Sequence, residues 1–121
     1  MPLPVSDDGG VAAGVAGTDS GSSQQPIVQD VLSTQAGSMA GGSGAVQLFS
    51  SPNVYRNSVL VMNNGTGDVY VGFTSDTSST KYIRKLAAGE STFLNLSPQV
   101  DVYVAPDATG GNYTAHELRV R

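Results

Sequence analysis

Residues 54–73 read VYRNSVLVMNNGTGDVYVGF, and this stretch decides the fold class. The contiguous apolar run at residues 59–62 is typical of a short strand that is buried on both faces. Turn-forming residues follow it, and among them Asn64-Gly65 is the sharpest hairpin signal in the chain. Residues 69–73 then alternate between the two faces of a strand. The stretch therefore predicts two β-strands joined by a tight turn, in which Gly65 needs a positive φ.

Strand-like segments separated by Pro, Gly and other turn residues recur on both sides of this stretch, about every ten residues. No window of comparable length shows helical periodicity with capping residues. This spacing predicts an all-β fold, a small antiparallel β-sandwich or jelly-roll-like barrel of about seven strands with an extended N-terminal arm. The other predicted strands are residues 46–50, 81–86, 92–96, 100–104 and 113–120.

A break in composition divides the chain near residue 45. Residues 1–45 contain nine of the fifteen glycines and no aromatic residue, Lys or Arg, whereas residues 46–121 contain all eight aromatic and all six basic residues. Gly, Ala and Ser bury too little apolar surface to offset the entropy of ordering the chain. We therefore predict a flexible Gly/Ala/Ser-rich N-terminal arm at residues 1–45 and a β-sandwich body at residues 46–121, with the glycine-rich residues 41–44 as a hinge.

The net charge of -4 lies entirely on the arm, which has four acidic side chains and no basic one, while the body has six of each. Residues 26–32 are the one apolar stretch of the arm, and they either dock onto another surface or form part of a disordered linker. Deletion of the arm is expected to leave the body folded, because the arm contains no aromatic residue. The candidate anchors of the arm are Ile27, Val28, Val31 and Leu32.

Residue types that carry chemistry are scarce in this sequence. The chain has no Cys and a single His, so a zinc or iron site would have to combine His116 with carboxylates. His116 has no Ser or Cys nucleophile in a strained turn beside it, and Asn63, Asn64, Asp68 and Asp76 fit a turn better than a calcium loop. We therefore predict no catalytic, cofactor-binding or metal-binding residues, no cofactor and no enzymatic activity.

Charge and hydropathy also argue against two kinds of partner. The acidic net charge disfavours sequence-independent binding of nucleic acid, which needs a basic surface. No apolar run approaches the ~18 residues of a membrane span. The first ten residues, MPLPVSDDGG, lack the basic region of a secretory signal. We therefore expect no nucleic-acid partner, no membrane partner and no signal peptide.

Two groups of side chains in the body are candidates for protein contacts. A basic cluster in one predicted strand is either a solvated strand face or a docking patch for an acidic surface, such as the arm of a neighbour. Tyrosines on strand faces either stack on sugars or form a subunit interface, and the interface is favoured. Because so small a core usually supplies no more than ~3–5 kcal/mol, we expect a homo-oligomer. The docking patch comprises Lys81, Arg84 and Lys85, and the interface aromatics are Tyr70, Tyr103 and Tyr113.

Four short motifs in a fixed order carry a resemblance to a known class of proteins. They are RNSVLVMNNG at 56–65, VYVG at 69–72, LAAGES at 86–91 and VYV at 102–104. The series resembles the small β-sandwich virion proteins of tailed bacteriophages, notably head decoration or cement proteins, over roughly residues 54–105.

The resemblance implies a structural role on the outer capsid surface of a virion. Proteins of this class typically form homotrimers, bind the major capsid protein, bridge neighbouring capsomers and extend arms to adjacent subunits, and this chain would be made in the host cytoplasm. Similar modules also occur in tails and fibres. A carbohydrate- or receptor-binding module of a tail fibre is therefore the alternative, and it would need exposed aromatic residues beside the polar loops at 75–80 or 107–112.

Overall fold

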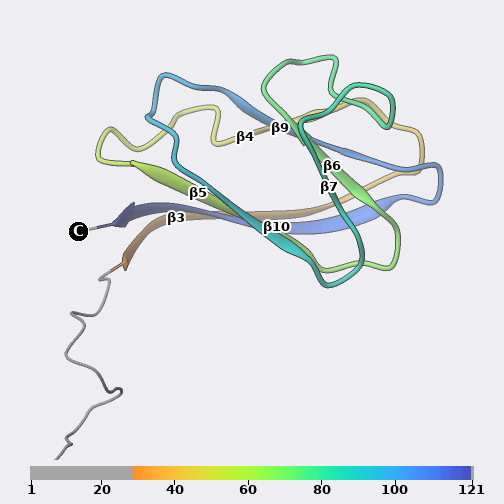
Figure 1. The fold of residues 1–121 in the computed structure, drawn as a ribbon, viewed down its shortest axis with the longest axis horizontal. Coiled ribbons are helices and arrows are strands. Elements are labelled where there is room, and N and C mark those ends of the chain that lie inside the picture. The colour runs from red at the N-terminus through yellow and green to blue at the C-terminus, as the bar shows by residue number, and fades with distance from the viewer. Residues whose placement is uncertain (1–28, 121) are drawn as a thin grey trace, which may run out of the picture.

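The computed structural model describes residues 29–120, which form eight strands and no helix. Two four-stranded antiparallel sheets pack face to face, so the predicted all-β sandwich is confirmed (Figure 1). The first sheet has the order β3 (Gln29–Met39), β10 (Gly111–Val120), β5 (Ser58–Asn63) and β8 (Ser91–Leu94). The second has the order β4 (Val46–Leu48), β9 (Val102–Pro106), β6 (Val69–Gly72) and β7 (Arg84–Leu86).

Strand β3 comes from the segment that the composition assigned to the arm. It pairs with β10 over nearly its whole length, from Met39 opposite Gly111 to Gln29 opposite Val120. The boundary predicted between an arm at 1–45 and a body at 46–121 is therefore wrong for residues 29–39. Composition measures the apolar surface of side chains, whereas β3 is held mainly by backbone hydrogen bonds, which small polar residues form equally well.

The predicted hairpin at Asn64-Gly65 is also wrong. Strand β5 lies in the first sheet and β6 in the second, so residues 64–68 connect the sheets instead of turning within one. Gly65 does not have a positive φ, unlike Gly42, Gly89 and Gly110. The Asn63 side chain fixes the connection by donating hydrogen bonds to the carbonyl oxygens of Gly67 (2.7 Å) and Leu86 (2.9 Å).

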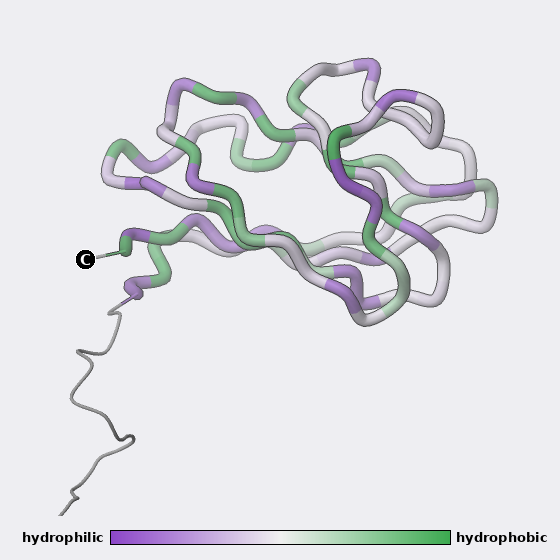
Figure 2. Tube along the Cα trace, in the orientation of Figure 1, coloured by the Kyte–Doolittle hydropathy of each residue, from purple (hydrophilic) through white to green (hydrophobic). Residues whose placement is uncertain are grey.

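The core lies between the two sheets, and half of its side chains are valines. Hydrophobic and hydrophilic residues alternate along several strands (Figure 2), whereas β6 is buried at all four of its positions. Burying one such side chain contributes about 1.5–3 kcal/mol relative to leaving it in water. The buried apolar cluster comprises Met39, Leu48, Phe49, Val59, Val61, Val69, Val71, Leu86, Val102, Val104, Tyr113 and Ala115.

The side chain of Gln35 in β3 forms three hydrogen bonds, and two of them reach β4 and the residue that follows it. Its Nε2 donates to the Tyr113 hydroxyl (3.0 Å) and to the carbonyl oxygen of Gln47 (3.3 Å), and its Oε1 accepts the N–H of Phe49 (2.8 Å). Phe49 has a φ of 53°, a left-handed conformation that costs a non-glycine residue roughly 1–2 kcal/mol. Gln35 therefore holds a strained backbone residue and satisfies the Tyr113 hydroxyl next to the core.

The turn after β3, predicted to be a hinge, is packed against the loop at 107–110. The N–H of Gly42 donates to the carbonyl oxygen of Asp107 (2.9 Å), and Gly42 has a φ of 71°. A Cβ at position 41 would overlap the carbonyl oxygen of Ala108, so Gly41 allows the close approach of the two segments. The turn therefore fixes β3 to the sandwich.

We predict that Gln35→Ala lowers the free energy of unfolding by about 1–3 kcal/mol, because partners of the lost amide would be left without a hydrogen bond. Urea denaturation of the two proteins measures the difference. The matched control is Gln99→Ala, since Gln99 is exposed and accepts only the hydroxyl of Ser97; its effect should stay within about 0.5 kcal/mol. Equal effects of the two substitutions would show that Gln35 does not join the sheets.

Candidate docking surface

Strands β6 and β7 are the only consecutive strands of the described chain that pair with each other, and residues 73–83 connect them. The connection is held by local hydrogen bonds. The Thr77 hydroxyl donates to the carbonyl oxygen of Thr74 (2.7 Å), and Ser78 and Lys81 exchange backbone hydrogen bonds (2.9 and 3.2 Å). Thr77 is buried against Gly72, where a Cβ would overlap the Thr77 hydroxyl. This connection is therefore an ordered part of the sandwich surface.

Three large apolar side chains on this connection face solvent. Phe73, Tyr82 and Ile83 are 38%, 45% and 49% exposed. They line a shallow hollow of about 280 Å³ together with Gly72, Thr74, Thr77 and Lys81. Exposed apolar side chains that lie together are a candidate for an interaction site. We call the exposed side chains of Phe73, Lys81, Tyr82, Ile83, Arg84 and Lys85 the docking surface.

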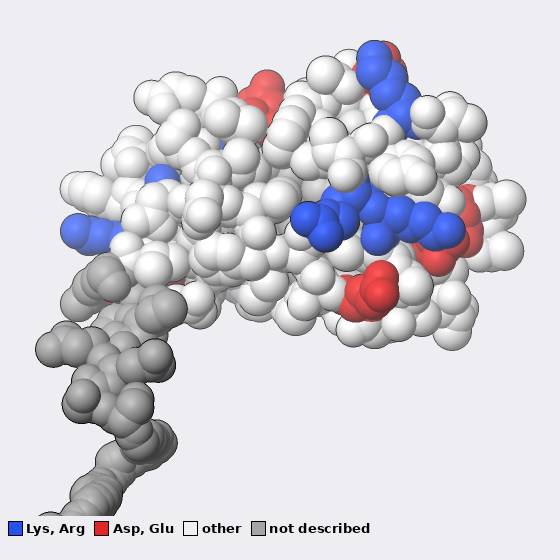
Figure 3. Space-filling view, in the orientation of Figure 1, with Lys and Arg blue, Asp and Glu red and all other residues white. Residues whose placement is uncertain are grey.

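The predicted basic cluster lies on this surface, and Lys and Arg side chains gather over the β6–β7 region (Figure 3). Two of its three charges have acidic partners: Lys81 pairs with Asp76 (2.6 Å), and Lys85 pairs with Asp68 (3.6 Å). Arg84 forms no ion pair with any of the described residues. The surface is therefore less basic than the sequence indicates, and Arg84 carries the uncompensated charge.

Asp76 and Lys81 stand at the edge of the hollow. The hydrogen bond from Lys81 holds the pKa of Asp76 below its usual value of 3.8, and a hydrogen bond from the Thr74 hydroxyl adds to this effect. The pair is therefore fully charged at neutral pH. Both side chains are exposed to solvent, so the pair orients the Lys81 ammonium more than it stabilises the fold.

The three tyrosines predicted to form an interface lie in different environments. Tyr70 is only 8% exposed because Tyr82 covers it, with ring centroids 5.0 Å apart and planes tilted by 50°. Tyr103 is half-buried and lies opposite Gly72 in the register of β9 and β6. Tyr113 is in the core, where its hydroxyl accepts a hydrogen bond from Gln35, so its assignment to an interface is wrong. Tyr70 supports the docking surface from below.

The predicted arm anchors fall partly on β3. Val31 is 59% exposed and lies opposite Leu118, while Leu32 is the extra residue where the register with β10 shifts. Ile27 and Val28 lie outside the described residues. Val31 and Leu32 therefore belong to the sheet, and an anchoring role for the four residues stays a prediction.

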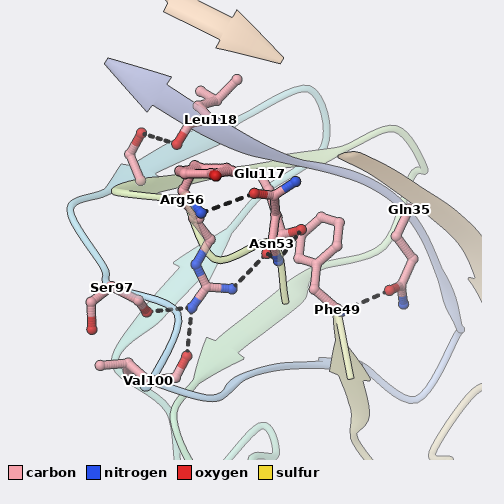
Figure 4. Close-up of polar contacts among 10 residues, drawn as sticks. Gln35, Phe49, Asn53, Arg56, Ser97, Val100, Glu117 and Leu118 are labelled. Carbon is pink, nitrogen blue, oxygen red and sulfur yellow. Dashed lines mark hydrogen bonds and ion pairs between the residues drawn. The ribbon is translucent and has the colours of Figure 1, made fainter. Parts of the chain in front are cut away.

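A buried ion pair that the sequence analysis missed joins β10 to the loops beside it. Arg56 donates to the Glu117 carboxylate (3.0 Å), and both side chains are 1% exposed. Arg56 also donates to the carbonyl oxygens of Ser97 and Val100, and Glu117 accepts the N–H of Asn53 (Figure 4). The inward position of Glu117 in the alternation of β10 was the available signal. The pair joins β10 to two loops.

Other chemistry is sparse in the described part of the chain. His116 is half-buried on the outer face of the first sheet, and its Nδ1 lies 2.9 Å from the Thr34 hydroxyl. Within residues 29–120, no three His, Cys, Asp or Glu side chains lie close enough together to hold a metal ion. The same residues include no helix long and apolar enough to cross a membrane.

Comparison of the chain with family models, with curated proteins and with solved structures gave no match.

We predict that Arg56→Ala lowers the free energy of unfolding by about 3–5 kcal/mol, because it leaves the Glu117 carboxylate buried without its partner. Arg119→Ala is the matched control, since Arg119 is exposed and stacks over the Tyr55 ring at 5.6 Å; it should cost no more than about 1 kcal/mol. Chemical denaturation measures both. The double substitution Arg56→Met with Glu117→Leu should recover most of the lost free energy of unfolding. A similar loss of this free energy in Arg56→Ala, in Arg119→Ala and in the double variant would contradict this account.

A second prediction concerns the pH dependence of the docking surface. A lowered pKa means that the Asp76–Lys81 pair is intact above pH 3.8 and is lost as the pH falls through the lowered value. Lys81→Ala should therefore raise the pKa of Asp76 towards 3.8, and Thr74→Ala should raise it by less. NMR titration of the carboxyl group measures the change. Arg84→Ala is the control and should leave this pKa where it is.

Proposed function

We propose that this chain is a structural virion protein that decorates and stabilises a phage capsid by bridging neighbouring capsomers, with its N-terminal arm lacing onto adjacent subunits. The observation that carries the proposal is that β3, the strand that follows the arm, and the docking surface lie at opposite edges of the sandwich. Strand β3, which follows the arm, lies over β4 through the hydrogen bonds of Gln35. Strands β7 and β8 contact each other at the other edge, beside the docking surface.

This arrangement suits a bridge because the body between the two regions is rigid. A sandwich with a packed valine-rich core does not stretch, so it holds two bound neighbours at a fixed separation. Binding to the assembled shell, and not to its separate subunits, shifts the equilibrium away from disassembly by mass action. The proposed partner is the major capsid protein, at the outer capsid surface.

The composition of the docking surface supports a protein partner. Aromatic residues and Arg are enriched at the centres of protein interfaces, and the surface offers Phe73, Tyr82 and Arg84. The acidic residues Asp7 and Asp8 of the arm complement Arg84 on a neighbouring copy. Such an attraction between exposed groups reaches only about 8 Å at physiological salt, so it selects contacts at close range.

One observation favours a second candidate function. The carbohydrate- or receptor-binding alternative needs exposed aromatic residues beside a polar loop. Phe73 and Tyr82 are exposed on either side of residues 75–80, which are mostly Ser and Thr. An aromatic face next to hydroxyl groups is a suitable platform for a sugar ring. We therefore keep a glycan-binding module of a tail or fibre as the second candidate.

The main test is co-sedimentation with undecorated particles of the phage that carries this chain. Tyr82→Ser should weaken attachment about tenfold or more, which corresponds to the loss of at least one strongly contributing aromatic contact. Tyr55→Ser is the matched control, because Tyr55 is exposed at 64% but lies outside the docking surface. A chain shortened to residues 29–121 should keep its fold and bind more weakly, because it lacks most of the arm.

Two outcomes would redirect the proposal. Equal binding by the full and shortened chains would remove the lacing role of residues 1–28. Glycan-array binding by the full chain that Tyr82→Ser abolishes, together with no binding to particles, would favour the second candidate.

A further inference from the structure

We infer that the edge of β3 that pairs with no other strand of residues 29–120 pairs antiparallel with the same edge of a second copy of this chain, so that the two first sheets join into one continuous sheet. The inference goes beyond the proposed function and does not depend on it, because it rests on the geometry of the sandwich alone. Its partner is another copy of this chain, and its surface is the backbone of residues 33–39.

The four edge strands of the sandwich differ in how well they are protected against such pairing. Strands β4 and β7 have three residues each, β8 has four, and β7 carries Arg84 and Lys85. Short length and charged side chains are the devices by which natural sheets block edge-to-edge association. Strand β3 has eleven residues, and among the described residues it pairs only with β10. It is therefore the edge best suited to strand addition.

Residues 33–39 form the regular part of β3. The register with β10 shifts at Leu32, and the chain turns away after Met39. Residues 33–39 contain no charged residue and no proline. The N–H and C=O groups of an edge strand that point away from its neighbour form a template for another strand. This segment offers that template without a break.

The register of the pair follows from symmetry. Two antiparallel copies of residues 33–39 overlap completely when the two-fold axis passes through Ala36. Isologous pairing of this kind uses the β3 edge of both copies and stops at two chains. The opposed residues are then Ser33 with Met39, Thr34 with Ser38, Gln35 with Gly37, and Ala36 with Ala36.

Side chains on the outer face of this segment favour a close approach. Thr34, Ala36 and Ser38 are exposed and small. Directly opposed residues of antiparallel strands have Cβ atoms about 4.5–5.5 Å apart, so large or like-charged side chains at these positions would oppose pairing. None of these three carries a charge. A second copy of the segment therefore meets no steric or electrostatic obstacle on this face.

Side chains on the inner face are already engaged within their own chain. Gln35 is hydrogen-bonded to Phe49 and Tyr113, and a Cβ at Gly37 would lie 3.2 Å from the Tyr113 hydroxyl. The added strand therefore displaces no inward side chain, and backbone hydrogen bonds supply the contact. Residues 33–39 of a second copy have the same length as this segment, equally small outer side chains and no charge. A second copy is therefore the partner that fits this edge.

The test is the mass of the full chain in solution, measured by sedimentation equilibrium. The full chain should form a dimer at micromolar concentration, and Ala36→Lys should weaken the dimer at least tenfold, because two like charges would face each other across the axis. Ala36→Glu should do the same. An equimolar mixture of the two variants should restore the dimer, because opposite charges would then face each other. Thermal melting checks that each variant folds, which is expected since Ala36 is exposed opposite Thr114.

A cross-linking experiment tests the register. The chain has no Cys, so Ala36→Cys introduces its single thiol, and two such chains should form a disulfide-linked dimer rapidly under mild oxidation. Ser91→Cys, on the exposed face of β8, is the control and should cross-link slowly. A monomeric full chain, a dimer that Ala36→Lys leaves unchanged, or faster cross-linking through position 91 would each overturn the inference.

Discussion

The pairing of β10 with a strand on each side is the interaction on which the rest of the structure depends. β10 lies between β3 and β5, and this position directs Tyr113, Ala115 and Glu117 into the space between the sheets. The Tyr113 hydroxyl then meets Gln35, and the Glu117 carboxylate meets Arg56. Two polar contacts on the inner side of the first sheet thus originate on one strand, and both require β10 to be held in register.

Much of the fold was predictable because alternation of apolar residues is a local signal. Each of the seven strands expected from residue 46 onward is present, usually with shorter bounds. Strand β3 was not predictable in this way, since Ser, Thr, Gln and Gly show no such alternation and the strand depends on a partner far along the chain. The turn at Asn64-Gly65 was mistaken for the same reason: local turn chemistry does not reveal which sheet the next strand joins.

The sequence predicted the charged residues of the docking surface but not its exposed apolar residues. Lys81, Arg84 and Lys85 stand close together in the sequence, and all three side chains are exposed in the structure. The exposure of Tyr82 and Ile83 could not be read from the sequence, because an apolar residue next to a strand is expected to face the core. Exposure here arises because they precede β7, which lies at the edge of the second sheet and pairs only with β6 among the described strands, a property of the tertiary structure.

Strand β3 and strand β10 run antiparallel, so Gln29 and Val120 lie side by side at one end of the sandwich. A force applied between Gln29 and Val120 would separate β3 from β10 by breaking their hydrogen bonds one after another. A force between Gln29 and the opposite end of the strands, where Met39 lies opposite Gly111, pulls β3 along its own axis instead. All of its hydrogen bonds to β10 then bear the load together, and they must break almost simultaneously. The same strand is thus mechanically weak in one direction and strong in the other.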